Sequence, residues 1–246
     1  MVEAAFRAKQ RVFAAVATIA GALPLGRARN AAPIRLPALI PCLRFKPGYV
    51  VFWAPYIAAY QLVNRFPIRE PVELQLTALD QAVPFLPALL PLYISYLLYY
   101  FWTVARLTSD RDVNRVFYAV HLQLAISLVF FVLYPVRMPR DLFYTGAAFN
   151  WADAFWRWFD APNNCFPSLH ASNVMLLMHV NWQRRGRWAA LLVGAAIVAS
   201  TLFVKQHYAV DLVAGFVVYL VAVAFLNRLE ITGADESGRR VDPVRA

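Results

Sequence analysis

The sequence has few charged residues for its length. Of its 246 residues only 15% are charged, whereas 61% are apolar and the mean hydropathy is +0.49. A soluble domain carries roughly 25% charged residues, because its large surface must be covered with polar groups. The composition therefore excludes a disordered chain and an ordinary soluble enzyme, and it indicates a membrane protein with several spans.

Cysteine is also scarce. The two cysteines, Cys42 and Cys165, exclude a disulfide-rich framework, and neither internal repeats nor low-complexity linkers divide the chain. We therefore expect one membrane-embedded domain over 47–228. A basic segment over 1–46 precedes it and a polar tail over 229–246 follows it, both on the cytoplasmic side.

Long apolar runs define the expected fold. Runs of roughly 20 apolar residues are typical of membrane helices, and short loops between them favour antiparallel neighbours. We predict an all-α integral membrane protein, a six-transmembrane-helix bundle. A shorter apolar segment over 12–25 follows three basic residues and is expected to form an interfacial helix, with a signal peptide or an extra span as alternatives. The six predicted spans are 48–64, 84–104, 116–136, 168–182, 187–204 and 207–227.

Acidic residues are fewer than basic ones, 14 against 24, which gives a net charge of +10. Such an excess would suit a nucleic acid or an anionic membrane surface. With six spans, however, 18 basic residues lie on the side of the termini and 6 on the other side. The positive-inside rule then places both termini in the cytoplasm, and we expect the plasma (inner) membrane. No nucleic-acid partner is expected, since the sequence carries no motif for one.

Three polar segments lie at the non-cytoplasmic ends of the predicted spans. Ionisable groups at membrane depth are costly, so each is a functional candidate. The segments are 134–140, which contains Arg137 and Arg140, then 163–172 and 200–211. Their convergence on one end of one bundle predicts an active site on the non-cytoplasmic face.

The third segment holds a candidate nucleophile. His207 and Asp211 are four residues apart at the start of a helix, so they share one face. The carboxylate can hold one imidazole nitrogen and leave the other with its lone pair for attack. Lys205 lies nearby as a candidate phosphate ligand, although an interfacial anchor explains it equally well.

The second segment holds a candidate acid. His170 follows Ser168 just inside a helix that begins near Pro167, a residue suited to a first helical turn. Free backbone N–H groups and the Ser168 hydroxyl there would bind an anion, beside which His170 could protonate a leaving group. Arg137 and Arg140 would add charge and forked donors for phosphate oxygens.

Two other functions fit parts of this pattern. The two imidazoles of His170 and His207 with the Asp211 carboxylate could bind a metal ion, but that would leave the surrounding phosphate-binding residues unexplained. A transporter or channel would need ionisable residues through the bilayer depth, whereas these stay near one face. We therefore expect neither a metal nor another cofactor, and a lipid in the membrane as the partner.

Together the motifs resemble those of the type 2 phosphatidic acid phosphatase superfamily. Pro167-Ser168-Leu169-His170 matches its Pro-Ser-x-His motif, and Ser200, His207 and Asp211 match its third motif at the right spacing, so the resemblance covers about 48–227. The resemblance implies that His207 forms a phosphohistidine with Asp211 as its partner. It also implies that His170 protonates the leaving group, and that Ser168 and the basic residues hold phosphate.

Some positions depart from the family pattern. The family's third motif is Ser-Arg-x5-His-x3-Asp, and Thr201 stands at its arginine. The first motif is of the Lys-x6-Arg-Pro type. Phe130 stands at its lysine if Arg137 is its arginine, and Leu133 does so if Arg140 is. The motif forms are most similar to the branch that contains inositol phosphorylceramide synthases, which move a phospho-headgroup to a lipid hydroxyl. The resemblance thus favours a lipid phosphotransferase, with a lipid phosphate phosphatase as the alternative. A catalytically inactive scaffold would not need His207 paired with Asp211.

Overall fold

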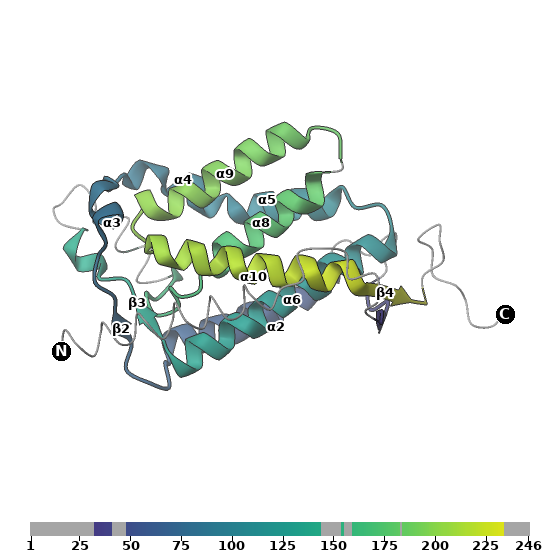
Figure 1. Ribbon diagram of the computed structural model, residues 1–246, viewed down its shortest axis with the longest axis horizontal. Helices are drawn as coiled ribbons and strands as arrows, with labels where there is room; N and C mark the ends of the chain where they lie inside the picture. Colours follow the sequence, from purple (N-terminus) through teal and green to yellow (C-terminus); the bar gives the residue numbers. More distant parts are fainter. Residues whose placement is uncertain (1–31, 41–47, 144–153, 155–158, 183, 234–246) are drawn as a thin grey trace.

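The computed structural model describes residues 32–40, 48–143, 154, 159–182 and 184–233. The predicted interfacial helix over 12–25 lies outside the described residues. The chain forms an elongated bundle of helices that run side by side (Figure 1). The helices are α2 (Gly48–Arg65), α3 (Ala78–Ala82), α4 (Leu90–Ile94), α5 (Tyr96–Ala105), α6 (Asp110–Leu133), α8 (Leu169–Trp182), α9 (Arg187–Phe203) and α10 (Ala209–Arg228), with 3₁₀ turns η1 (Pro87–Leu89) and η2 (Arg140–Leu142).

Helices form at all six of the predicted apolar segments. Within the described ranges, three are long and apolar enough to cross a membrane, namely Pro87–Ala105, Asp110–Leu133 and Ala209–Arg228. The apolar helix α9 is shorter, with 17 residues. The protein is therefore a mostly helical membrane protein.

Two predicted spans differ from the helices observed. The segment predicted over 84–104 begins at Pro87 and is interrupted at Ser95, whose hydroxyl donates to the carbonyl of Leu92 (2.6 Å). The segment predicted over 116–136 forms α6, which begins at Asp110 because the Ser109 hydroxyl accepts from the backbone N–H of Asp112 (3.0 Å). Apolar runs do not reveal these ends, because they are set by polar contacts.

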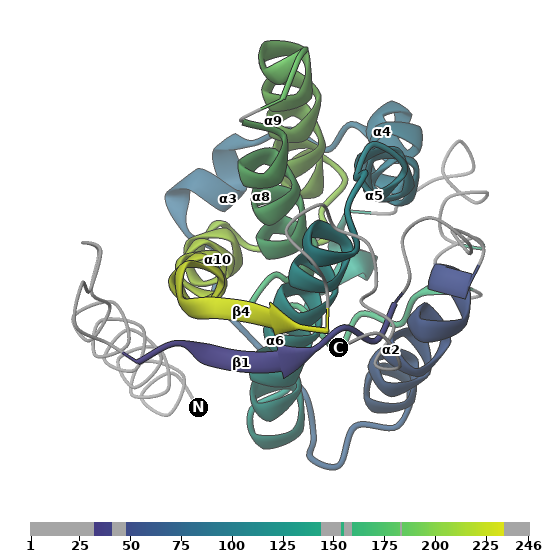
Figure 2. The ribbon, with the colours of Figure 1, turned by 90° about the vertical axis from the view of Figure 1, so that its right-hand side faces the viewer.

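Helix α8 lies at the centre of the bundle and packs against α5, α6, α9 and α10. Figure 2 shows α8 end-on, with α9 and α10 on either side of it. Helix α10 lies close to the residue before α8 at Gly215, where an added Cβ would lie 2.6 Å from the backbone oxygen of Ser168. Glycine at this position therefore lets α10 approach the residues that open α8.

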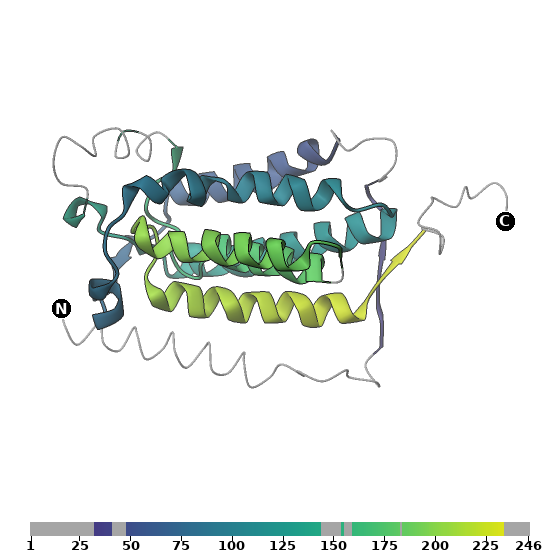
Figure 3. The same ribbon diagram turned by 90° about the horizontal axis from the view of Figure 1, so that it is seen from above.

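Two short parallel sheets were not anticipated by the all-α prediction. Strand β1 (Ile34–Pro37) pairs with β4 (Leu229–Thr232), and β2 (Val72–Glu73) pairs with β3 (Val136–Arg137). Strands of four and two residues are too short for an alternating pattern to reveal them. The two sheets lie at opposite ends of the bundle (Figures 1 and 3). One end thus joins the first and last described segments, and the other carries the three polar segments.

Candidate active site

His207 is held from one side by its neighbours. It lies in the turn between α9 and α10, and its Nδ1 donates to the carbonyl oxygen of Cys165 (3.0 Å) and to Oδ2 of Asp211 (3.3 Å). Oδ2 of Asp211 also accepts the backbone N–H of Tyr208 (2.9 Å), and Asp211 is fully buried. Two acceptors at Nδ1 fix the proton there, so Nε2 is the ring nitrogen left with a lone pair.

A backbone hydrogen bond joins the second and third polar segments. The N–H of Ser168 donates to the carbonyl oxygen of Asp211 (3.0 Å), at the same place where Gly215 brings the two helices together. Ser168 is fully buried, and its Oγ accepts the N–H of Ala171 (3.1 Å) at the start of α8. The hydroxyl predicted to contact phosphate therefore caps α8 in this structure.

His170 lies in the first turn of α8 against two tyrosine rings. Its ring stacks on Tyr93 (4.3 Å between centroids) and contacts Tyr96 at a tilt (4.7 Å). Its Nε2 is buried and has no hydrogen-bond partner among the described residues. The stacking fixes the ring, while this nitrogen stays available to a substrate.

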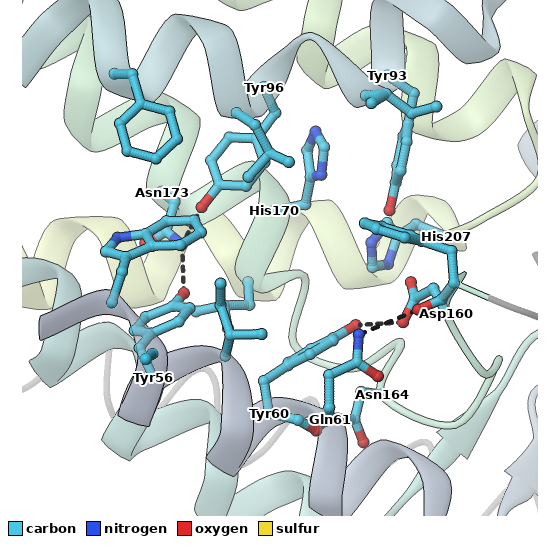
Figure 4. Close-up of a pocket in the computed structure, with 18 residues that line it drawn as sticks. Tyr56, Tyr60, Gln61, Tyr93, Tyr96, Asp160, Asn164, His170, Asn173 and His207 are labelled. Atoms are coloured by element: carbon cyan, nitrogen blue, oxygen red, sulfur yellow. Dashed lines mark hydrogen bonds between the residues drawn. The ribbon is translucent and has the colours of Figure 1, made fainter. Parts of the chain in front are cut away.

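Both imidazoles line one apolar cavity. The cavity has a volume of about 420 Å³ and opens between α2, α4, α5 and α8, with Asp160 and Asn164 among its polar lining residues. Figure 4 shows His207 and His170 among its tyrosines, with Asp160 on the far side of His207 from His170. An apolar cavity with a few converging polar groups suits a ligand that is mostly hydrocarbon. Its aromatic lining consists of Trp53, Tyr56, Tyr60, Tyr93, Tyr96, Phe101 and Phe159.

A second, polar cavity shares Asp160 with the first. Its volume is about 520 Å³, and its lining includes Glu73, Arg137, Arg140 and Asp141. The two cavities therefore adjoin at Asp160, one apolar and one lined with charged groups.

The two candidate arginines differ in their surroundings. Arg137 is half-exposed and forms an ion pair with Glu73, with Nη2 2.7 Å from Oε1. The Arg140 guanidinium donates to the backbone oxygen of Asp160 (2.7 Å) and to the Oε1 of Gln206, the residue before His207. Arg140 thus lies next to the turn that carries His207 (the histidine turn), whereas Arg137 is paired with Glu73 in the lining of the polar cavity.

Lys205 points away from the two histidines. It is 3% exposed, and its Nζ donates to the backbone oxygens of Asp80 (2.7 Å) and Val83 (2.6 Å). Burial lowers the pKa of Lys205, and Asp80 opposes that shift. Lys205 does not line either cavity. In this structure the lysine connects the turn before α10 to α3 through these hydrogen bonds.

Several residues at the site were not predicted from the sequence. Asp80 is buried, and its Oδ1 accepts the N–H of Ala209 (2.7 Å) at the first residue of α10. Thr77 and Asp80 form a capping box, a signal that the sequence did carry. Asp160 and Asn173 belong to none of the motifs. Asn173 donates to the hydroxyls of Tyr56 (2.7 Å) and of Tyr96, and it thereby orders the cavity wall.

One group of described residues has the spacing of a metal site. The ligand atoms of Cys165, His207 and Asp211 lie within 4.8 Å of one another. The thiol hydrogen is directed to the carbonyl of Pro162 (3.2 Å), and burial raises the pKa of Cys165 well above its usual value. The thiol also lies 3.5 Å from the carbonyl oxygen of Gln206, and Oδ2 of Asp211 accepts from His207 and from the N–H of Tyr208. The contacts therefore fit a hydrogen-bonded histidine better than a metal site.

The comparisons with known proteins bear on the whole of this site. A family model described as the PAP2 superfamily matches residues 76–225, which include both histidines, Asp211, Ser168 and the two arginines. The chain belongs to the PAP2 superfamily. No curated protein and no solved structure matches the chain. Membership of the PAP2 superfamily supports an enzyme that acts on phosphate esters, and the apolar helices place it in a membrane.

The two arginines give a matched test. We expect Arg140→Ala to lower kcat/KM on a lipid phosphate by about 10- to 100-fold, because it removes a charged donor beside the histidine turn. Arg137→Ala should change kcat/KM by less than about 3-fold, since the half-exposed guanidinium pairs with Glu73 and not with the residues of the histidine turn. Steady-state kinetics in detergent micelles, with thermal unfolding as a check on folding, measures both. Equal losses in the two variants would contradict this assignment.

Proposed function

We propose that this PAP2 superfamily member transfers a phosphoryl group from a membrane lipid through a phosphohistidine on His207. The observation that carries the proposal is the fixed His207 ring, whose Nδ1 bonds to Asp211 and Cys165 while the ring lines an apolar cavity. A nucleophile oriented by a carboxylate needs such an arrangement. The aromatic lining of the cavity suits the hydrocarbon part of a lipid.

The first step follows from the positions of the two histidines. Nε2 of His207 attacks phosphorus, the bond from phosphorus to the leaving oxygen breaks, and His170 gives that oxygen a proton. Asp211 stabilises the positive charge that develops on the His207 ring. Arg140 lies close enough to the turn to offset charge on the phosphoryl oxygens. Positioning of reactants supplies much of the rate enhancement in such reactions.

We favour transfer to a lipid hydroxyl over hydrolysis. The motif forms resemble the inositol phosphorylceramide synthase branch, and the buried hydroxyl of Thr201, which donates to the carbonyl of Val198 (2.7 Å), takes the place of a family cation. With Lys205 directed elsewhere, the described site has few cations for a phosphomonoester with two negative charges. Hydrolysis of phosphatidic acid or isoprenyl phosphates is the second candidate, supported by the same histidine geometry.

We further propose that six helices span the membrane and that the site faces the non-cytoplasmic side of the plasma (inner) membrane. The site and the β1–β4 pair lie at opposite ends of the bundle, and the basic residues concentrate on the side of the termini. A reporter fused after Arg245 is then expected in the cytoplasm. A non-cytoplasmic signal would contradict this topology.

The reaction is tested by lipid product analysis. The purified protein is given phosphatidic acid, phosphatidylinositol, phosphatidylglycerol or an isoprenyl phosphate, each with and without ceramide or diacylglycerol. A new phospholipid that forms without free phosphate identifies a transferase, and free phosphate identifies a phosphatase. If no donor yields either product, the proposed function is wrong.

A further inference from the structure

Asp160 is a buried carboxylate that belongs to none of the superfamily motifs described above. It is 8% exposed, and its Oδ1 accepts from Asn64 (Nδ2, 2.5 Å) and from the hydroxyl of Tyr60 (3.2 Å). Both donors come from α2, about 100 positions earlier in the chain. Two donors on one oxygen fix the side chain in one orientation.

The second oxygen of Asp160 differs from the first. Among the described residues, the side-chain hydrogen bonds to Asp160 both go to Oδ1, so Oδ2 can accept from a ligand. Asp160 lines both the apolar and the polar cavity. A hydrogen-bond donor from a ligand in the cavities would complete its coordination, and an anionic phosphate oxygen cannot donate.

The position of Asp160 relative to His207 indicates which ligand group could donate a hydrogen bond to Oδ2. Asp160 and His207 both line the apolar cavity, and the Arg140 guanidinium joins their surroundings by donating to the backbone oxygen of Asp160 and to Gln206, the residue before His207. In Figure 4 His207 lies between Asp160 and His170, which come from different walls of the cavity. His170 is stacked on Tyr93 of α4, and Asp160 is held by α2. A phosphoryl group on His207 therefore has proton-transfer groups from two separate walls.

We propose that Asp160 is the general base of the second step, which binds the acceptor hydroxyl through Oδ2. This inference rests on the proposed phosphohistidine reaction. The acceptor oxygen attacks phosphorus, the bond from phosphorus to Nε2 breaks with its electron pair returning to His207, and the acceptor proton moves to Oδ2. Asp160 then releases that proton to solvent, and His170 regains one from solvent for the next turnover.

The environment of Asp160 suits a group that accepts a proton. Burial raises the pKa of Asp160, and the neighbouring Arg140 guanidinium opposes that rise. A base is most effective when its pKa approaches the working pH. The acceptor class is any compound with an O–H group, either a lipid alcohol or water, and the two are separated by their products.

The test measures the two steps separately in the full-length protein. Phosphatidic acid, phosphatidylinositol and phosphatidylglycerol with a fluorescent acyl chain all release the same labelled diacylglycerol when His207 attacks phosphorus and the diacylglycerol oxygen leaves. Phosphatidic acid then leaves a phosphoryl group on the histidine, whereas the other two leave their phospho-headgroup. Single-turnover release without ceramide reports the first step, and steady-state turnover with ceramide reports the second. We expect D160N to keep the first rate within about 3-fold and to slow the second by about 100-fold or more.

Glu230→Gln is the matched control. It removes the same charge from an exposed residue that pairs with Arg35 at the opposite end of the bundle, and both rates should stay unchanged. If D160N does not fold, D160E replaces it, because one added methylene displaces the carboxylate and should also slow the second step alone. A parallel loss in both steps, or an unchanged second step, would overturn the role of Asp160.

The outcomes separate this inference from the reaction on which it rests. Absence of labelled diacylglycerol with every phospholipid donor together with no product from an isoprenyl phosphate, or full release by His207→Ala, would refute the proposed function itself. A wild-type burst that depends on His207, combined with normal turnover in D160N, would refute the inference alone.

Discussion

Replacing His207 with alanine is expected to abolish both transfer and hydrolysis, with a loss of more than about 10⁴-fold in turnover. The substitution removes the nucleophile and leaves Asp211 and the carbonyl of Cys165 without their shared donor. The decisive measurement is phosphate retained on the protein. A donor lipid carrying ³²P should label the wild-type protein in an acid-labile, base-stable form and should leave the variant unlabelled.

His179→Ala provides the matched control for this loss. His179 lies on the central helix α8, but its imidazole contacts the hydroxyl of Tyr219 (3.4 Å) and lines neither cavity. The control should retain wild-type turnover and labelling. Turnover that survives in His207→Ala, or label that persists on it, would exclude a phosphohistidine at this position.

The second large effect is expected at His170, and it should depend on the leaving group. His170→Gln should slow release of diacylglycerol from a phospholipid by about 10²- to 10⁴-fold, the usual contribution of a general acid. An ester with a 4-methylumbelliferyl leaving group needs no protonation, so the same variant should cleave it at a rate within about 10-fold of wild type. Comparing the two substrates measures proton donation directly.

Tyr93→Phe is the matched control for the His170 variant. It keeps an aromatic ring against the imidazole, which stacks at 4.3 Å in the wild type. We expect Tyr93→Phe to retain the wild-type ratio of rates on the two substrates. If His170→Gln loses equal activity on both esters, His170 positions the substrate and does not donate a proton.

The pair proposed to carry out catalysis could be found in the sequence because its geometry is local. His207 and Asp211 are separated by one helical turn, and the observed hydrogen bond between them has this spacing. His170 was recognised for a similar reason, since its position just after Pro167 fixes it at a helix start. Contacts within one turn follow from spacing alone, so these predictions needed no knowledge of how the helices pack.

The remaining residues depend on distant packing that spacing does not encode. Asp160 reaches α2 through Tyr60 and Asn64, and Lys205 turns toward Asp80, 125 residues earlier in the chain. Charge and hydropathy could place Lys205 near the correct end of the bundle but could not give the direction of its side chain. The same limit applied to β1, whose partner strand begins at Leu229.

The pairing of β1 with β4 has a consequence for biosynthesis. Arg35 in β1 and its partner Glu230 in β4 are 195 residues apart, so β1 is translated long before its partner exists. At the usual elongation rate of about 5 to 20 residues per second, the first strand waits about 10 to 40 s for the second. During that interval β1 is an unpaired edge that other chains could occupy. Its parallel pairing therefore belongs among the last events of folding, and it forms only after α10 has been synthesised.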